Sequence, residues 1–233
     1  MSYQGRQVIV TGGTGALGAA VVGGLIKAGA TCYVPWRHEA EVERFAYRGH
    51  EQVKLFGSVD LTDESAVDRL FGDVPALWAS IHVAGGFAMG PLAKTQKADL
   101  MHLLDMNFVS CSLCCSHAVN AIGHSGQGGR IVNVAARHAL EWRGGAGLVA
   151  YTASKAAVAA LTVALSEEVA KEGILVNAVA PSIMDTPANR AAMPKADYKA
   201  WPKVEEVAAT ILFLASPENK VTRGAVVPVY GRS

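Results

Sequence analysis

The sequence predicts an α/β protein in which a doubly wound parallel sheet of about seven strands carries helices on both faces. Short runs rich in β-branched residues alternate with longer amphipathic stretches along the chain, which is typical of repeated β-α units. Most of the short runs are apolar throughout, and this indicates strands that are buried on both faces, as in a parallel sheet. No linker or low-complexity segment interrupts the pattern, so we expect a single domain over residues 1–233.

The expected elements alternate in the order that such a fold requires. Strands are predicted from apolar, often β-branched runs at residues 7–11, 31–34, 52–56, 77–83, 130–134, 175–180 and 225–230. Helices are predicted from apolar positions that recur at helical spacing at residues 16–28, 39–47, 63–71, 97–122, 150–172 and 203–214. Gly29 marks the end of the first helix, because glycine favours the position after the last helical turn.

The composition excludes several classes of function. Charged residues make up 18% of the chain and the formal net charge is +1, which argues against a nucleic-acid partner held by bulk charge. The N-terminal residues have one short apolar run and then glycines, unlike a secretory leader. The longest apolar regions contain polar residues such as Asn107 and Lys155 and are expected to be buried helices rather than membrane spans. We therefore expect a soluble cytoplasmic protein without a membrane partner.

Three of the four cysteines lie close enough together in the sequence to suggest metal ligands. Cys111, Cys114 and Cys115 lie close together with His117 nearby, and Cys32 stands alone. A structural zinc site usually takes its four ligands from two separated pairs, and the sequence has no second pair. We therefore expect these cysteines to be small packing residues in a helix, and we expect no metal ion.

A glycine-rich turn follows the first expected strand and precedes the first expected helix. It reads Thr11-Gly-Gly-Thr-Gly-Ala-Leu-Gly18. Glycines at such a turn let the backbone approach a pyrophosphate, and the helix N-terminus offers free N–H groups. In this position between a strand and a helix, the turn predicts a dinucleotide site.

The end of the second expected strand indicates which dinucleotide is bound. A site for NAD typically has a carboxylate there to hold the ribose hydroxyls, but the sequence has Trp36 and Arg37 instead. Arginine can pair with a 2′-phosphate, so we favour NADP over NAD. Asp60 follows the third expected strand, where it could accept a hydrogen bond from adenine or cap the next helix.

Tyr151 and Lys155 form a candidate proton-transfer pair. They lie four residues apart near the start of an expected helix, so both side chains share one face. A phenol titrates near pH ~10, and a neighbouring ammonium lowers its pKa toward the range useful for acid–base catalysis.

Together these motifs resemble the short-chain dehydrogenase/reductase family. The ordered set covers nearly the whole chain and consists of Thr11-Gly12, Gly18, Asp60, Ala84-Gly85, Asn107, Tyr151-x-x-x-Lys155, Pro181, Thr186 and Val221-Thr222-x-Gly224. The resemblance implies a Rossmann-type fold, a nicotinamide cofactor and a small-molecule substrate. It also implies a homodimer or homotetramer formed through the helices at 97–122 and 150–172.

The resemblance further implies a role for each matching residue. Tyr151 would be the proton donor or acceptor, Lys155 would hold the nicotinamide ribose and tune Tyr151, and Asn107 would support a proton relay. The residues implied in cofactor binding are Gly12, Thr14, Gly15, Leu17, Gly18, Arg37, Asp60, Leu61, Ala84, Gly85, Tyr151, Lys155, Pro181, Ile183 and Thr186.

The sequence departs from the family pattern at several positions. The usual Asn-Asn-Ala-Gly reads His82-Val83-Ala84-Gly85, and the usual Asn-(Ile/Val)-Ser-Ser after the fifth expected strand reads Asn133-Val134-Ala135-Ala136. The second serine of that motif polarises the substrate carbonyl in the family, and the methyl group of Ala136 cannot donate a hydrogen bond.

Three hypotheses account for the missing serine. His138 or Arg137 replaces it as the electrophile. Alternatively, the substrate is a C=N compound that needs no polarisation, since dihydropteridine reductases are similar in keeping the Tyr–Lys pair without the serine. In the third hypothesis the protein binds NADP but turns over slowly, as a sensor or scaffold.

Apolar side chains in three loops predict a small, partly aromatic substrate pocket. The segment between the sixth expected strand and the last helix is short, so we expect a compact lid and a small or flat substrate. The candidate lining residues are Phe87, Met89, Leu140, Trp142, Met193, Tyr198 and Trp201.

Overall fold

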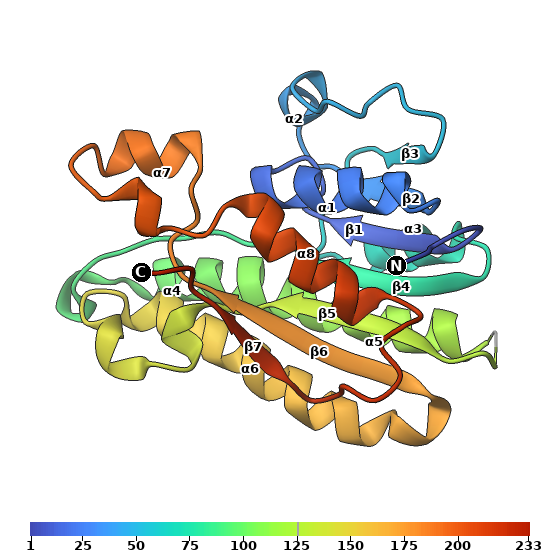
Figure 1. The fold of residues 1–233 in the computed structure, drawn as a ribbon. Coiled ribbons are helices and arrows are strands. Elements are labelled where there is room, and N and C mark those ends of the chain that lie inside the picture. Colours follow the sequence, from blue (N-terminus) through green and yellow to red (C-terminus); the bar gives the residue numbers. More distant parts are fainter. Residues whose placement is uncertain (125) are drawn as a thin grey trace.

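Seven parallel strands form one sheet in the computed structural model, which describes residues 1–124 and 126–233 (Figure 1). Their order across the sheet is β3-β2-β1-β4-β5-β6-β7, so the chain winds outward from β1 in both directions, as the sequence predicts. The strands are β1 (Gln7–Thr11), β2 (Thr31–Pro35), β3 (Val53–Phe56), β4 (Leu77–His82), β5 (Gly129–Val134), β6 (Ile174–Pro181) and β7 (Val226–Val229).

Helices cover both faces of the sheet (Figure 1). One face packs against α1 (Ala16–Lys27) and α8 (Val204–Ala215), and the other against α3 (Glu64–Gly72), α5 (Ser110–Gly123) and α6 (Val149–Glu168). The shorter helices are α2 (Glu39–Glu43), α4 (Lys97–Leu104) and α7 (Pro187–Ala192). Single 3₁₀ turns occur at Leu92–Lys94, Arg137–Ala139, Trp142–Gly145, Ala170–Glu172 and Tyr198–Ala200.

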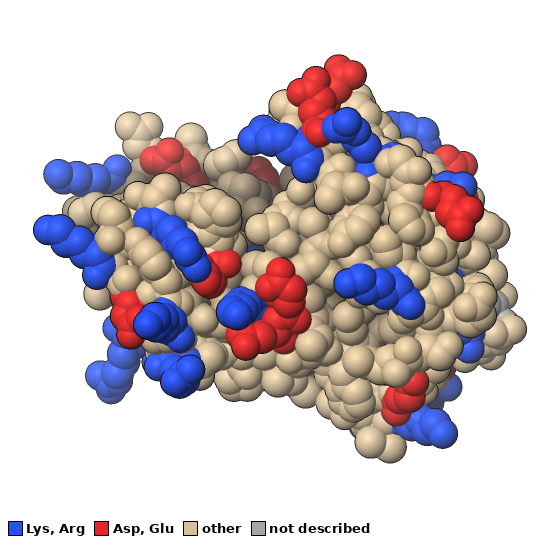
Figure 2. Space-filling model, turned by 45° about the horizontal axis from the view of Figure 1, so that its top comes forward, with Lys and Arg blue, Asp and Glu red and all other residues tan. Residues whose placement is uncertain are grey.

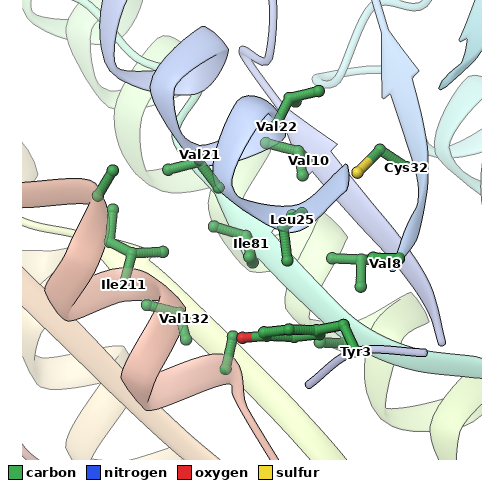
Figure 3. Close-up of a cluster of buried hydrophobic side chains, with 14 of the residues drawn as sticks. Tyr3, Val8, Val10, Val21, Val22, Leu25, Cys32, Ile81, Val132 and Ile211 are labelled. Atoms are coloured by element: carbon green, nitrogen blue, oxygen red, sulfur yellow. The ribbon is translucent and has the colours of Figure 1, made fainter. Parts of the chain in front are cut away.

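Two apolar layers hold the helices to the sheet. In the layer under α1 and α8, Tyr3, Leu25 and Ile211 are fully buried (Figure 3). The layer on the opposite face includes Ile122 and Ile131. Burial of each such apolar side chain contributes about 1.5–3 kcal/mol to the free energy of unfolding. The central strands are buried on both faces because one apolar layer covers each face of the sheet.

The helix boundaries differ from the sequence prediction where tertiary contacts intervene. The helix expected at 39–47 ends at Glu43, because the Phe45 side chain turns into the core. The helix expected at 150–172 ends at Glu168 and continues only as a 3₁₀ turn to Gly173, whose φ is +73°. The short α7 was not predicted from the sequence. Asp63, rather than Asp60, caps α3 by accepting from the Ser65 N–H.

The helix expected at 97–122 is interrupted by a π turn. It runs as α4, then the π turn Asp105–Val109, then α5. An extra residue in one turn rotates the side chains that follow it, and π turns are frequent at functional sites. Here the turn contains Asn107, which is buried.

Parallel strands place all of their carboxyl ends at one edge of the sheet, where ligands bind in doubly wound folds. Figure 2 shows the surface hollowed between the part that carries α7 and the part that carries α2, with Lys and Arg interspersed with Asp and Glu around it. The long apolar helix α6 meets the length of a membrane span, but it packs on β6 as part of the core.

Candidate active site

The turn after β1 is shaped by close backbone contacts. Gly12 has a φ of +65°, and a Cβ there would lie 2.7 Å from the Ala84 nitrogen. A Cβ on Gly18 would lie 2.1 Å from the Gly12 carbonyl oxygen. The Thr11 hydroxyl accepts from the Ala84 N–H at 3.3 Å. A residue with a side chain therefore cannot replace Gly12 or Gly18 unless the backbone moves.

The start of α1 fits the pyrophosphate of a dinucleotide. Gly15 occupies the N-cap position and has no side chain. Within α1, all of which the structure describes, the first turn carries no acidic residue. Its free N–H groups and positive dipole end are therefore available to an anion. Thr14 lies in the same turn, and its hydroxyl donates to Glu41 Oε2 at 3.3 Å. Leu17 is buried in the core layer behind the turn, and Leu61 packs on the opposite layer.

Arg37 and Asp60, two of the predicted cofactor residues, form an ion pair with each other. Arg37 Nη2 lies 2.9 Å from Asp60 Oδ2, and the Arg37 side chain is 60% exposed. Hydrogen bonds from the side chain and backbone of Thr62, and more weakly the Arg37 charge, lower the pKa of Asp60. An exposed pair of this kind contributes at most about 1 kcal/mol, so a bound phosphate can compete for Arg37.

Asn107, Gly85 and Lys155 meet between β4 and α6. Asn107 Oδ1 accepts from the Gly86 N–H at 2.9 Å, and its Nδ2 donates to the Gly86 carbonyl and to Ser154 Oγ, each at 3.1 Å. A Cβ on Gly85 would lie 2.6 Å from Asn107 Oδ1 and 3.2 Å from Lys155 Nζ. The structure thus brings together residues that are 70 positions apart in the sequence, and a side chain at Gly85 would separate them.

Burial sets the protonation of Tyr151 and Lys155. Burial lowers the pKa of Lys155 to about 8, and Lys155 Nζ donates to the Val134 carbonyl at 2.8 Å. Burial raises the pKa of Tyr151 to about 12. The lowered phenol pKa expected from the sequence is therefore wrong for this structure, because desolvation dominates at Tyr151 and the ammonium is directed at a backbone carbonyl. Tyr151 is in its protonated form at neutral pH.

Two rings flank Tyr151 at its edges. The Phe87 ring lies 5.0 Å and the His138 ring 6.3 Å from the Tyr151 ring, measured between centroids, and both are nearly perpendicular to it. Ala136 is buried and presents no donor. Arg137, the other candidate replacement for the serine, is engaged elsewhere: it pairs with Glu141 at 2.7 Å and stacks on Tyr230 at 4.8 Å. Of the two candidates, His138 is the one in contact with Tyr151.

The segment after β6 carries three further predicted cofactor residues. Pro181 ends the strand and is buried, whereas the Ile183 side chain is 42% exposed. The Thr186 side chain caps α7 by accepting from the Asn189 N–H at 3.2 Å. Thr186 therefore has a structural role in addition to the cofactor contact predicted for it.

Six of the seven expected substrate residues separate into two groups, and the half-buried Met193 belongs to neither. Phe87, Met89, Leu140 and Trp142 are all 40% or more exposed, and the loops that carry them meet where the Gly90 N–H donates to the Gly147 carbonyl at 2.8 Å. Tyr198 and Trp201 instead line a separate cavity of about 860 Å³ beside α8 and β7. The residues that line that cavity do not include Tyr151 or Lys155, whereas Phe87 of the first group lies against the Tyr151 ring.

The three cysteines of α5 are buried in the core, as expected from the sequence, but the histidine beside them is not the one that is near in the sequence. Cys111 and Cys115 meet His82, not His117, while the His117 ring lies against the Leu113 carbonyl and Asp68. The hydrogen bond from Cys115 lowers the pKa of Cys111 and raises that of Cys115. Sequence reasoning noted His82 as a departure but did not connect it to the i, i+4 spacing of Cys111 and Cys115, which are distant from it in the chain.

Comparison with known proteins identifies the class that this fold and site define. The family model for short chain dehydrogenases matches residues 6–197. Galactitol 2-dehydrogenase of Rhizobium johnstonii is 33% identical over 98% of this chain and 97% of its own. A (2S)-[(R)-hydroxy(phenyl)methyl]succinyl-CoA dehydrogenase subunit of Thauera aromatica is 30% identical over 99% and 97%. The chain belongs to the short-chain dehydrogenase/reductase family and is an NAD(P)-dependent oxidoreductase.

Solved structures agree with the fold. A short-chain type dehydrogenase/reductase from Mycobacterium ulcerans superimposes with a TM-score of 0.89 at 25% identity, covering 100% of this chain and 90% of that one. The structure described as ElxO with NADP bound gives a TM-score of 0.86 at 24% identity, covering 97% of each chain. The Rossmann-type architecture predicted from the sequence is confirmed. Membership of the family supports a nicotinamide cofactor.

Proposed function

We propose that this chain is an NADP(H)-dependent oxidoreductase that interconverts a small carbonyl compound and its alcohol, with Tyr151 as proton donor and acceptor. The observation that carries the proposal is the convergence of Asn107 and Lys155 at Gly85, close to a tyrosine whose edges face Phe87 and His138. The names of the similar dehydrogenases, which refer to hydroxy compounds, support an alcohol substrate.

The protein residues supply the proton and the positioning, while the nicotinamide, when bound, supplies or accepts the hydride. Because its pKa is about 12, Tyr151 holds its proton at neutral pH and is ready to donate it to a developing alkoxide. The Lys155 ammonium, which donates to the Val134 carbonyl in this structure, would have to turn toward Tyr151 to stabilise the phenolate that this transfer leaves. Asn107 and Ser154 hold the segment near Lys155 through their mutual hydrogen bond.

His138 takes over the task of the missing serine. Its ring lies at the edge of Tyr151, half-buried, at the start of the β5–α6 loop. A ring N–H there can donate to a substrate carbonyl, where one preorganised donor contributes about 10²–10³-fold to turnover. Ala136, at the position of the family's serine, has no side-chain donor that would compete with His138 for the substrate carbonyl. This assignment supports the carbonyl substrate over a C=N substrate.

Arg37 supports NADP rather than NAD. The last residues of β2 and the two that follow it include no carboxylate to hold the ribose hydroxyls, and Arg37 is exposed there. Its pair with Asp60 is weak enough to yield to a charge-assisted hydrogen bond from a phosphate. The residues proposed to hold the cofactor are those predicted from the sequence, with the glycine turn and the α1 N-terminus at the pyrophosphate.

A two-class substrate panel tests the proposed reaction. We expect purified protein to oxidise NADPH with simple and aryl ketones, and Tyr151→Phe to lose about 10²–10⁴-fold in kcat while its NADPH affinity stays within a few-fold. Turnover of only quinonoid dihydropterin and cyclic iminium compounds would replace the carbonyl proposal with the C=N alternative. Tight NADPH binding without turnover of either class would support the sensor alternative.

A homodimer or homotetramer remains our proposal for the assembly. Apolar side chains on the outer faces of α4 and α6, Met101, Val149 and Val163, are 42–46% exposed, and covering them would remove apolar area from water. Light scattering at micromolar concentration tests this proposal, and a strictly monomeric protein would contradict it.

A further inference from the structure

Four potential ligand atoms meet in the interior between β4, β5 and α5, one layer below the proposed reaction site. Three of them, His82 Nδ1, Cys111 Sγ and Cys115 Sγ, lie within 4.8 Å of one another. Asn133 Oδ1 lies within 3.5 Å of each of these three atoms, and the four residues are 0–5% exposed. Cys111 and Cys115 lie one helical turn apart, so both thiols face the same side of α5. Neither residue contributes to the oxidoreductase chemistry proposed above.

The distances between these atoms approach those of a tetrahedral zinc site. Asn133 Oδ1 lies 3.4 Å from Cys111 Sγ and 3.5 Å from Cys115 Sγ, and His82 Nδ1 lies 4.0 and 3.5 Å from the same sulfurs. Zinc with bonds of about 2.3 Å to sulfur and about 2.0–2.2 Å to nitrogen and oxygen holds its ligand atoms about 3.4–3.8 Å apart. The separation that must widen most is His82 Nδ1 to Asn133 Oδ1, now 2.8 Å.

The surrounding hydrogen bonds orient both of the non-sulfur ligands. His82 Nε2 lies 2.8 Å from Ser80 Oγ, so an Nε2–H that donates to Ser80 leaves the Nδ1 lone pair for a metal. Asn133 Nδ2 donates to Thr162 Oγ1 at 2.9 Å, and Thr162 in turn donates to the Val158 carbonyl at 2.8 Å. Metal-bound histidines almost always have such a partner for their other ring nitrogen.

The charge of the ligand set selects the class of ion. Two thiolates neutralise a dication, so the loaded site buries no net charge, whereas an unpaired ion in this interior would be costly. Thiolate and imidazole ligands suit zinc, while magnesium and calcium prefer oxygen ligands. Binding releases the two thiol protons and moves the single proton of the neutral His82 ring from Nδ1, where it lies against Asn133 Oδ1, to Nε2, where it is donated to Ser80.

We propose that His82, Cys111, Cys115 and Asn133 form a structural zinc site that ties α5 to the carboxyl ends of β4 and β5. His82 lies two residues before Ala84, and Cys111 lies four residues after Asn107. A metal bridge between them would therefore fix the strand end and the helix that carry the floor of the proposed reaction site. The site does not depend on which substrate the protein turns over.

Cobalt binding to the full-length chain, kept reduced with a phosphine, tests the proposal. We expect one Co²⁺ per chain, with intense thiolate-to-cobalt charge-transfer bands and the visible bands of tetrahedral cobalt, all removed by equimolar Zn²⁺. Cys111→Ser and Cys115→Ser should each weaken binding by more than about 100-fold, and Ser80→Ala by about 10–100-fold. Cys114→Ser is the matched control, because Cys114 is buried on the same helix but outside the ligand set, and it should bind like the wild type.

Absence of the charge-transfer bands in the wild-type protein would overturn the proposal, and so would equal binding by Cys111→Ser. If the cysteine variants do not fold, X-ray absorption on zinc-loaded wild type decides instead. We expect two sulfur neighbours at about 2.3 Å and two nitrogen or oxygen neighbours at about 2.0–2.2 Å. A zinc shell without sulfur would show that the four residues are only a hydrogen-bonded cluster. None of these readouts requires turnover, so failure here is distinguishable from failure of the proposed oxidoreductase function.

Discussion

The turn after β1 and the loop after β5 both lie at the carboxyl edge of the sheet, yet they are built in different ways. The first is made of backbone: a Cβ on Gly12 would lie 2.7 Å from the Ala84 nitrogen, and one on Gly18 would lie 2.1 Å from the Gly12 carbonyl oxygen. The second places side chains, with Ala136 where the family has serine and His138 against Tyr151. In the proposed function, cofactor binding therefore depends on the close approach of the backbone, and substrate activation depends on the position of one side chain, that of His138.

The strongest test of the backbone side of this comparison is Gly18→Ala. The added methyl group must displace the Gly12 carbonyl, so we expect a loss of about 3 kcal/mol in unfolding free energy and about 100-fold weaker NADPH binding. Thermal unfolding and a fluorescence titration measure the two effects. Gly49→Ala is the control, because a Cβ there meets nothing within 4 Å. Wild-type affinity in Gly18→Ala would show that the turn is not rigid.

The second test measures how the unfolding free energy depends on pH, and it concerns the buried Lys155 side chain. The pKa of Lys155 is lowered to about 8 from 10.5, so the unfolded chain binds more protons between these values and stability rises with pH across that window. Relative to Lys155→Met, we expect the unfolding free energy of the cofactor-free wild type to rise by about 3 kcal/mol from pH 8 to pH 10.5. Parallel denaturation curves for the two proteins over this range would contradict the burial of a charged Lys155.

The third test concerns the side-chain region and replaces the proposed electrophile. We expect His138→Ala to lower kcat for ketones by about 10²-fold with little change in NADPH binding, and His138→Gln, which keeps a donor, to recover part of that loss. Arg137→Ala serves as the neighbouring control, because Arg137 is engaged with Glu141 and Tyr230. If Arg137→Ala is the more damaging variant, the assignment of His138 is wrong.

The smallest expected effect concerns cofactor choice at the glycine turn. Glu41 accepts from the Thr14 hydroxyl at 3.3 Å and places a carboxylate beside the phosphate-binding turn. Glu41→Gln removes that charge, so the preference for NADP over NAD should rise by about two- to fivefold, less than about 1 kcal/mol. The ratio of kcat/KM with the two cofactors measures it, with Glu39→Gln on the same helix as control. An unchanged ratio would place the 2′-phosphate away from Glu41.

The sequence by itself determined the features that depend on local chemistry. Alternating apolar runs predicted the seven strands and the doubly wound order, and the glycine spacing predicted the turn at Gly12 to Gly18. The four-residue spacing predicted that Tyr151 and Lys155 share a helix. These inferences hold because strand burial, glycine conformation and helix periodicity depend on residues near one another in the chain.

Only the tertiary structure decided which distant residues meet. It paired Arg37 with Asp60, joined His82 to Cys111 and Cys115, and raised rather than lowered the pKa of Tyr151. It also ended the helix after Glu43 and placed a π turn at Asn107. The physical reason is that pairing and desolvation depend on how far each side chain is removed from water and on what the packed elements bring against it, which no local pattern encodes.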